Sequence, residues 1–136
     1  MDGQRQPRGR GVIYGPLDLL FIVLHSVVIL FNMLGWVARR TRRANLLLLL
    51  ATGLSWTVLG LFHGIGYCPL TDWHYQVLSA QGATQLPPSY MVYMTERWLG
   101  WQPEARLADA VTVAGYLLAL SASAYLNWRD ARAEMR

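Results

Sequence analysis

The residues that could do chemistry gather in one stretch, HGIGYCPLTDWHYQVL, residues 63–78. It holds His63, His74 and the chain's only cysteine, Cys68. These side-chain types bind zinc or copper, and Asp72 or Asp18 could supply a fourth ligand. The spacings of five and then six residues match no helical or knuckle pattern of zinc ligands. His63, Cys68 and His74 are therefore candidate metal ligands, but their spacing does not predict a metal site.

Two other chemistries use the same residues. Haem held between His25 and His63 needs both rings on one axis, but their expected depths in a membrane differ by about 9 Å. A site with a single histidine ligand stays open. A Cys68 thiolate could also act as a nucleophile with His63 or His74 as its base. We expect no cofactor, and we keep a haem- or metal-binding redox protein that uses His25, His63 and Cys68 as an alternative.

A mechanical interpretation explains more of this stretch. Gly64 and Gly66 let the chain bend, Pro69 prevents the preceding helix from continuing, and Thr71 is a good N-cap for the next helix. Cys68 is then a small residue packed under that helix. We interpret the stretch as the turn by which the chain leaves a membrane.

The elements that must position these residues are membrane helices. Of the 136 residues, 54% are hydrophobic and only 15% are charged, against about 25% charged in typical soluble domains. The excess is concentrated in residues 17–37, 46–65 and 107–128, each long enough to cross a hydrocarbon core of about 30 Å. The first run is too long for a signal peptide and is followed by Arg39 and Arg40.

The sequence thus predicts an all-α integral membrane protein with three transmembrane helices and two short interfacial helices. Its expected parts are a mobile arm at 1–15, one membrane domain at 16–128 with helices at about 17–37, 45–66 and 104–128, an interfacial region at 67–103, and a tail at 129–136.

The interfacial helices are predicted from their boundary residues. Thr71 and Gly82 would bracket a helix over about 72–81, and Ser89 and Gly100 a second one to about Leu99. Pro103 suits the first turn of the third span. Because seven of the sixteen aromatic residues fall in this region, we expect both helices on the outer membrane surface. A small folded cap outside the membrane is the alternative.

Charge sets the expected orientation. All twelve basic residues are arginine, and the loop RRTRR at 39–43 carries four of them. Short arginine-rich loops stay cytoplasmic, which places seven arginines inside and five outside, with the N-terminus outside and the C-terminus in the cytoplasm. Because the arginines flank membrane segments, we expect no nucleic-acid partner.

Polar residues form stripes inside the predicted spans. Asp18, His25 and Asn32 are seven residues apart and share one helix face. The next helix carries a second narrow polar stripe, made of Asn45, Thr52, Trp56 and His63. Unpaired polar groups are costly in hydrocarbon, so we expect the two stripes to face each other. Asp18 would pair with His63, His25 would lie level with Trp56 and Thr52, and Asn32 would lie near Thr52. This polar seam is either a functional site or the contact that joins the helices.

The third span carries a ridge of small residues, Gly115, Ala119 and Ser123, which permits close helix contact.

These residues resemble a family of small bacterial membrane proteins, domain of unknown function twenty-seven eighty-four. The resemblance rests on His25, on the step from Asn32 to Gly35, and on Gly66-Tyr67-Cys68-Pro69-Leu70-Thr71 after the second helix. An acidic residue usual just after that motif is replaced here by Trp73-His74. The resemblance implies a location in the bacterial inner membrane and supplies no reaction.

No catalytic spacing is specific enough to predict an enzyme. The sequence favours a non-catalytic accessory or assembly subunit that binds the bilayer and another membrane protein, a lipid, or a second copy of itself. Besides the redox alternative, an enzyme that acts on lipid headgroups at Asp18, His63 and His74 remains open.

Overall fold

The computed structural model describes the backbone of residues 8–136 and the side chains of residues 15–136. This part of the chain is helical, without strands. Its elements are α1 (Arg8–Leu34), α2 (Arg42–Leu54), the π-helical turn η1 (Ser55–Leu59), α3 (Gly60–His63), α4 (Pro69–Ala80), α5 (Tyr90–Leu99) and α6 (Ala105–Glu134). Three helical segments are long and apolar enough to cross a membrane, namely Gly15–Leu34, Arg42–His63 and Ala105–Glu134. The predicted fold class is confirmed.

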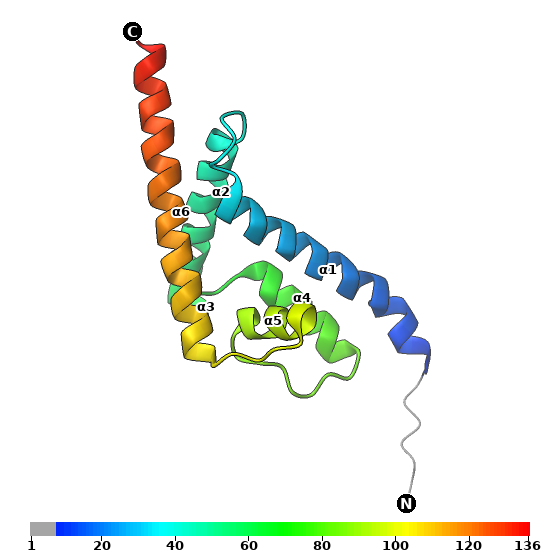
Figure 1. Ribbon diagram of the computed structural model, residues 1–136. Coiled ribbons are helices and arrows are strands. Elements are labelled where there is room, and N and C mark those ends of the chain that lie inside the picture. The colour runs from blue at the N-terminus through cyan, green and yellow to red at the C-terminus, as the bar shows by residue number, and fades with distance from the viewer. Residues whose placement is uncertain (1–7) are drawn as a thin grey trace, which may run out of the picture.

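The three spans do not form a closed bundle. The span Arg42–His63 packs along α6, whereas α1 packs mainly on α4. Figure 1 shows α1 diverging from α2 and α6, with α4 and α5 in the opening between them. We refer to α4, α5 and their connection as the cap. The two short helices thus share a core with α1, in which Ile22 packs against Tyr90 and Met94.

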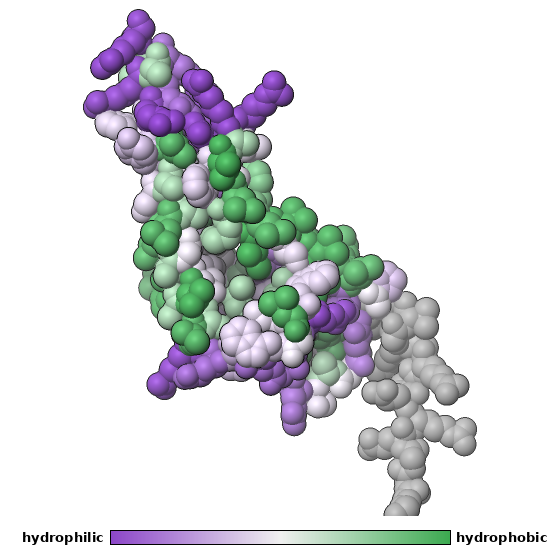
Figure 2. Space-filling model, in the orientation of Figure 1, coloured by the Kyte–Doolittle hydropathy of each residue, from purple (hydrophilic) through white to green (hydrophobic). Residues whose placement is uncertain are grey.

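Hydropathy divides the surface into zones. Figure 2 shows apolar side chains along the middle of the spans and hydrophilic ones gathered at the end that carries the C-terminus. That end holds two ion pairs, Arg42–Asp130 and Arg43–Glu134, at 2.8 and 2.9 Å. These pairs explain why α6 continues to Glu134, into residues predicted as a tail: each joins the last turns of α6 to the start of α2.

The start of α1 also lies further out than expected. Its backbone is helical from Arg8, within the predicted arm 1–15, because the apolar run marks where a span begins and not where a helix begins. Residues 1–7, for which the sequence predicts mobility, lie outside the described residues. At the other end, α1 stops at Leu34 rather than at residue 37.

The second span contains a feature that the sequence analysis missed. Its helix widens to a π turn at Ser55–Leu59, and the chain that follows folds back onto this turn. Gly66 N–H donates to the Trp56 carbonyl at 3.1 Å, and the Ser55 hydroxyl donates to the Tyr67 carbonyl at 2.9 Å. The reversal needs positive φ, which Gly64 (108°) and Gly66 (90°) supply.

The predicted start of the first cap helix is wrong. α4 begins at Pro69 with Cys68 in the N-cap position, and Thr71 lies inside its first turn. Proline is favoured at the first helical position because its missing N–H would have no partner there. Ser89 does precede α5, and Gly100 ends it with a left-handed conformation. Pro103 precedes α6, whose N-cap is Glu104.

The turn between α1 and α2 depends on Gly35. A Cβ there would lie 2.6 Å from the Phe31 carbonyl oxygen and 2.8 Å from Asn45 Nδ2. The Thr41 hydroxyl donates to the Gly35 carbonyl at 2.6 Å and closes the turn.

We expect Gly35→Ala to lower the free energy of unfolding by about 1–3 kcal/mol, because the new methyl group must displace a backbone carbonyl and the Asn45 amide. Gly15→Ala is the matched control: its Cβ would meet nothing within 4 Å, so a helical alanine should be neutral or stabilising. Thermal unfolding of both variants in the same mild detergent measures the difference, and equal midpoints would contradict the proposed close approach.

Candidate functional site

The main polar cluster of the described residues lies where the cap meets α1. Asp18, on α1, accepts a hydrogen bond from His74 Nε2 at its Oδ1, 2.8 Å away. Its Oδ2 accepts one from Arg97 Nη2, also at 2.8 Å. One carboxylate thereby joins α1 to both helices of the cap.

The predicted pair of Asp18 and His63 is therefore wrong. His63 is exposed, stacks on Tyr67 with 4.4 Å between ring centroids, and places Nδ1 3.2 Å from the Leu59 carbonyl oxygen. Because α4 packs on α1, the histidine that reaches Asp18 comes from the cap and not from the second span.

His74 is the buried centre of the cluster, with no exposed side-chain area. Its second nitrogen, Nδ1, lies 2.7 Å from the Tyr90 hydroxyl. Since the Asp18 carboxylate can only accept, Nε2 carries a proton, and a neutral His74 would then accept the Tyr90 proton at Nδ1. Asp18, His74 and Tyr90 thus form a continuous hydrogen-bonded chain.

His25 continues this cluster deeper along α1. Its ring stacks on Tyr90 with centroids 4.2 Å apart, and 8% of the residue is exposed. Its Nδ1 is buried without a partner among the described residues. The expected neighbour Trp56 instead packs on Tyr116, with 4.9 Å between ring centroids. This part of the predicted seam does not face the second span.

Three cap tyrosines surround His74. Burial raises the pKa of Tyr75 to about 12 and also raises the pKa values of Tyr90 and Tyr93. All three hydroxyls therefore stay protonated at neutral pH. The Tyr75 hydroxyl donates to the Pro87 carbonyl at 2.9 Å, whereas the Tyr93 hydroxyl accepts a hydrogen bond from Arg97 Nη1 at 3.2 Å. The hydrogen bond to Asp18 raises the pKa of Arg97, which holds the positive charge beside the carboxylate.

Tyr90, Tyr93 and Arg97 also belong to the cluster, although the sequence did not predict them as members. A signal for them exists, because positions i, i+3 and i+7 share one face of a helix. Here that face carries two aromatic rings and a cation, and it turns toward α1.

A second polar contact joins the spans near the opposite membrane boundary. Asn32 Nδ2 donates to the Thr52 hydroxyl at 3.1 Å, so their predicted proximity is confirmed. Asn45 is fully buried and donates from Nδ2 to the Phe31 carbonyl at 2.6 Å. The two predicted stripes therefore meet at this end only.

The small residues of α6 lie at its contacts with the other two spans. Ala119 packs with Leu49 and Tyr116, Ser123 is fully buried, and a Cβ on Gly115 would lie 3.5 Å from the Met33 sulfur. The Tyr116 hydroxyl donates to the Leu49 carbonyl at 2.8 Å, a contact that Gly53 permits because a Cβ there would strike the hydroxyl.

The metal candidates of the sequence do not come together. His63 is exposed, Cys68 is half-buried at the start of α4, and His74 is occupied by Asp18 and Tyr90. Among the described residues, no three His, Cys, Asp or Glu side chains lie close enough to hold a metal ion. His25 and His63 stack on different tyrosines, Tyr90 and Tyr67.

The cluster is arranged to hold charge and to fix position. Both Asp18 oxygens and both His74 nitrogens are bound by protein groups, so these two side chains join α1 to both helices of the cap. A chain of this kind can relay a proton between Asp18 and Tyr90, but its main effect is to compensate a carboxylate at the edge of a span.

A family model described as Protein of Unknown function (DUF2784) matches residues 16–128. The chain therefore belongs to that family. Comparison with curated proteins and with solved structures gave no match.

Asp18→Ala should lower the free energy of unfolding by about 3 kcal/mol. The substitution removes the carboxylate to which both His74 and Arg97 donate, and the buried His74 is left without that acceptor. His63→Ala, the control, should change it by less than about 0.5 kcal/mol, since its ring is exposed. Unfolding of both variants in mild detergent measures the difference. An equal loss of stability in the two variants would contradict the pairing of Asp18 with His74 and Arg97.

The tyrosines predict a loss of stability at high pH. A raised folded-state pKa means that the folded chain keeps a proton that the unfolded chain releases, so stability is complete below pH 10 and falls as the pH approaches about 12. Tyr75→Phe should make the free energy of unfolding depend less on pH between these two limits. A variant profile that runs parallel to that of the wild type between those limits would contradict the burial of the phenol.

Proposed function

We propose that this protein is a non-catalytic accessory or assembly component of the bacterial inner membrane that binds a transmembrane helix of a larger protein. The orientation that accompanies the proposal has the cap outside and the arginine loop at 39–43 in the cytoplasm, following the positive-inside rule. The polar cluster supports a structural role, because Asp18, His74 and Arg97 tie α1 to both helices of the cap.

The free lateral surface of the spans is the observation that carries the proposal. In the most apolar window of each span, only 17%, 11% and 22% of the residues are buried within the chain. α1 is held mainly by the cap rather than by a bundle. Most of the helical surface is therefore available to lipid or to another protein.

The free face of α6 has the pattern of a helix contact. Its exposed residues alternate large and small at steps of three and four, in the order Val111, Ala114, Leu118, Ser121 and Tyr125. This spacing is the seam of a left-handed helix pair, and small residues let two backbones approach closely in a membrane. The opposite face of α6 already packs on the second span through Tyr116 and Ala119.

A photo-crosslinking residue at Leu118, which is 73% exposed, should give one adduct with a larger membrane protein in native membranes. The same residue at Leu61, 78% exposed on the second span, is the control and should give lipid adducts only. Ala114→Leu with Ser121→Leu should remove the Leu118 adduct, whereas Ala51→Leu on the exposed side of α2 should not. A lipid adduct alone at Leu118, or an adduct of twice the chain's mass, would overturn the proposal.

One observation favours a second function, a redox protein with a single-histidine haem. The buried Nδ1 of His25 has no partner among the described side chains. A Soret band in the purified protein that disappears in His25→Leu would replace the first proposal, and a spectrum without visible bands would remove the second.

A further inference from the structure

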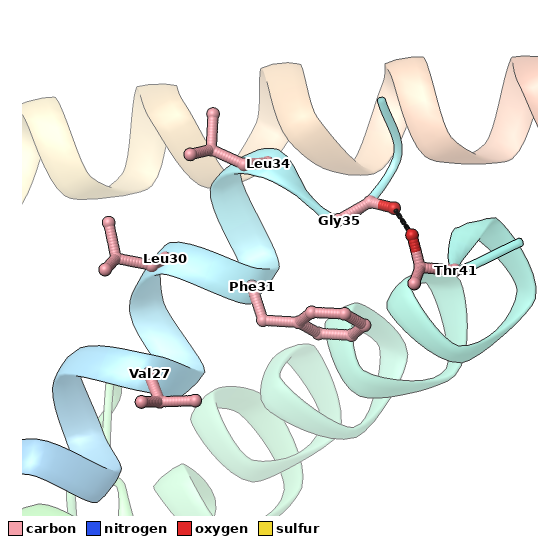
Figure 3. Close-up of a pocket in the computed structure, with 6 residues that line it drawn as sticks. All are labelled: Val27, Leu30, Phe31, Leu34, Gly35 and Thr41. Atoms are coloured by element: carbon pink, nitrogen blue, oxygen red, sulfur yellow. Dashed lines mark hydrogen bonds between the residues drawn. The ribbon is translucent and has the colours of Figure 1, made fainter. Parts of the chain in front are cut away.

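An open apolar groove runs between α1 and the start of α2. It has a volume of about 390 Å³ and is lined by Val27, Leu30, Phe31, Leu34, Gly35 and Thr41. Figure 3 shows the leucines and Phe31 along α1 and the bond from Thr41 to Gly35 that closes one end. From Val27 to Leu34 the groove follows about 10 Å of helix, about a third of a hydrocarbon core.

The closed end of this groove is the loop that carries the arginines. Arg42 and Arg43 are bound to Asp130 and Glu134 of α6. Arg39 and Arg40, directly before Thr41, are exposed and have no carboxylate within ion-pair distance among the side chains that the structure describes. The four arginines line a polar hollow of about 240 Å³ together with these two carboxylates, so the hollow keeps an excess of positive charge.

We propose that the groove and the loop together bind one anionic phospholipid, with an acyl chain in the groove and the phosphate at Arg39 and Arg40. The guanidinium group binds phosphate oxygens in a bidentate manner, and basic pockets at the cytoplasmic ends of membrane helices suit anionic headgroups. The apolar and the cationic surfaces meet at Thr41, as the chain and the phosphate of a lipid do.

Charge complementarity selects this occupant. An apolar transmembrane helix of another protein would cover the groove and leave the excess positive charge of the hollow uncompensated, and a soluble anion would use the arginines without the groove. A lipid with an anionic headgroup uses both surfaces at once. The proposed lipid site is separate from the face of α6 and does not depend on the proposed protein partner.

The headgroup half is tested by native mass spectrometry of the full chain in neutral detergent, titrated with phosphatidylglycerol or with phosphatidylcholine of the same acyl chains. The wild type should bind phosphatidylglycerol more tightly. Arg39→Gln with Arg40→Gln should weaken that binding by about fivefold per arginine, or about 25-fold together. Arg129→Gln with Arg136→Gln removes the same charge from exposed positions of the C-terminal end and should have little effect. Equal losses in the two double variants, or equal binding of the two lipids, would overturn the proposal.

The acyl-chain half needs a different variant. Leu30→Trp fills the groove and should reduce the binding of both lipids several-fold, whereas Leu47→Trp, on an exposed site of α2, should not. Circular dichroism confirms that each variant keeps its helix content. Unchanged lipid binding in Leu30→Trp would show that the groove takes no chain and would overturn the site as proposed.

Discussion

The Asp18 carboxylate is the constraint on which the cap end of the structure depends. A charge at the edge of a span must be compensated, and here His74 and Arg97 do so at 2.8 Å from its two oxygens. Asp109 makes a parallel contact from α6, where it accepts a hydrogen bond from the Ser89 hydroxyl at 2.5 Å. Each of the two diverging helices thus offers one acidic residue to the cap, which explains how the cap stays in the opening between them.

At the end of the spans away from the cap, uncharged groups join α1 to the second span. Asn32 and Asn45 connect α1 to the second span through side-chain and backbone oxygens, and Gly35 allows the two chains to approach there. Interhelical hydrogen bonds of this kind contribute about 0.6 kcal/mol each to stability in membranes. Removing one partner of a buried ion pair costs more stability than that. The contact at Asn32 and Asn45 therefore sets where α1 meets the second span, while the Asp18 cluster holds the other end of α1 on the cap.

The sequence predicted the spans and the inner contact because both follow from local rules. Run length and apolar composition define a span, and a seven-residue repeat defines a face; these rules found the contact of Asn32 with Thr52. The partner of Asp18 could not be found in this way. The rise per residue gives the expected depth only for residues within the two spans. His74 comes from a helix outside them, whose position is set by packing between residues far apart in the sequence. The π turn at Ser55–Leu59 leaves no composition signal either, since Gly66 and Tyr67 stabilise it from outside the helix.

Holding α1 on the cap has a consequence for the rest of the surface. A closed three-helix bundle would bury one face of every helix. Here α1 contacts the second span near its own C-terminal end, at Phe31 and Asn32, and α6 uses one face for the second span. The alternating large and small residues of α6 then stay exposed, and the groove beside Thr41 stays open because α1 diverges from α2 as it leaves the loop. The Asp18 contact thereby determines the geometry of two surfaces that it does not touch. Shortening or loosening the cap would let α1 close onto the other spans and would alter both surfaces.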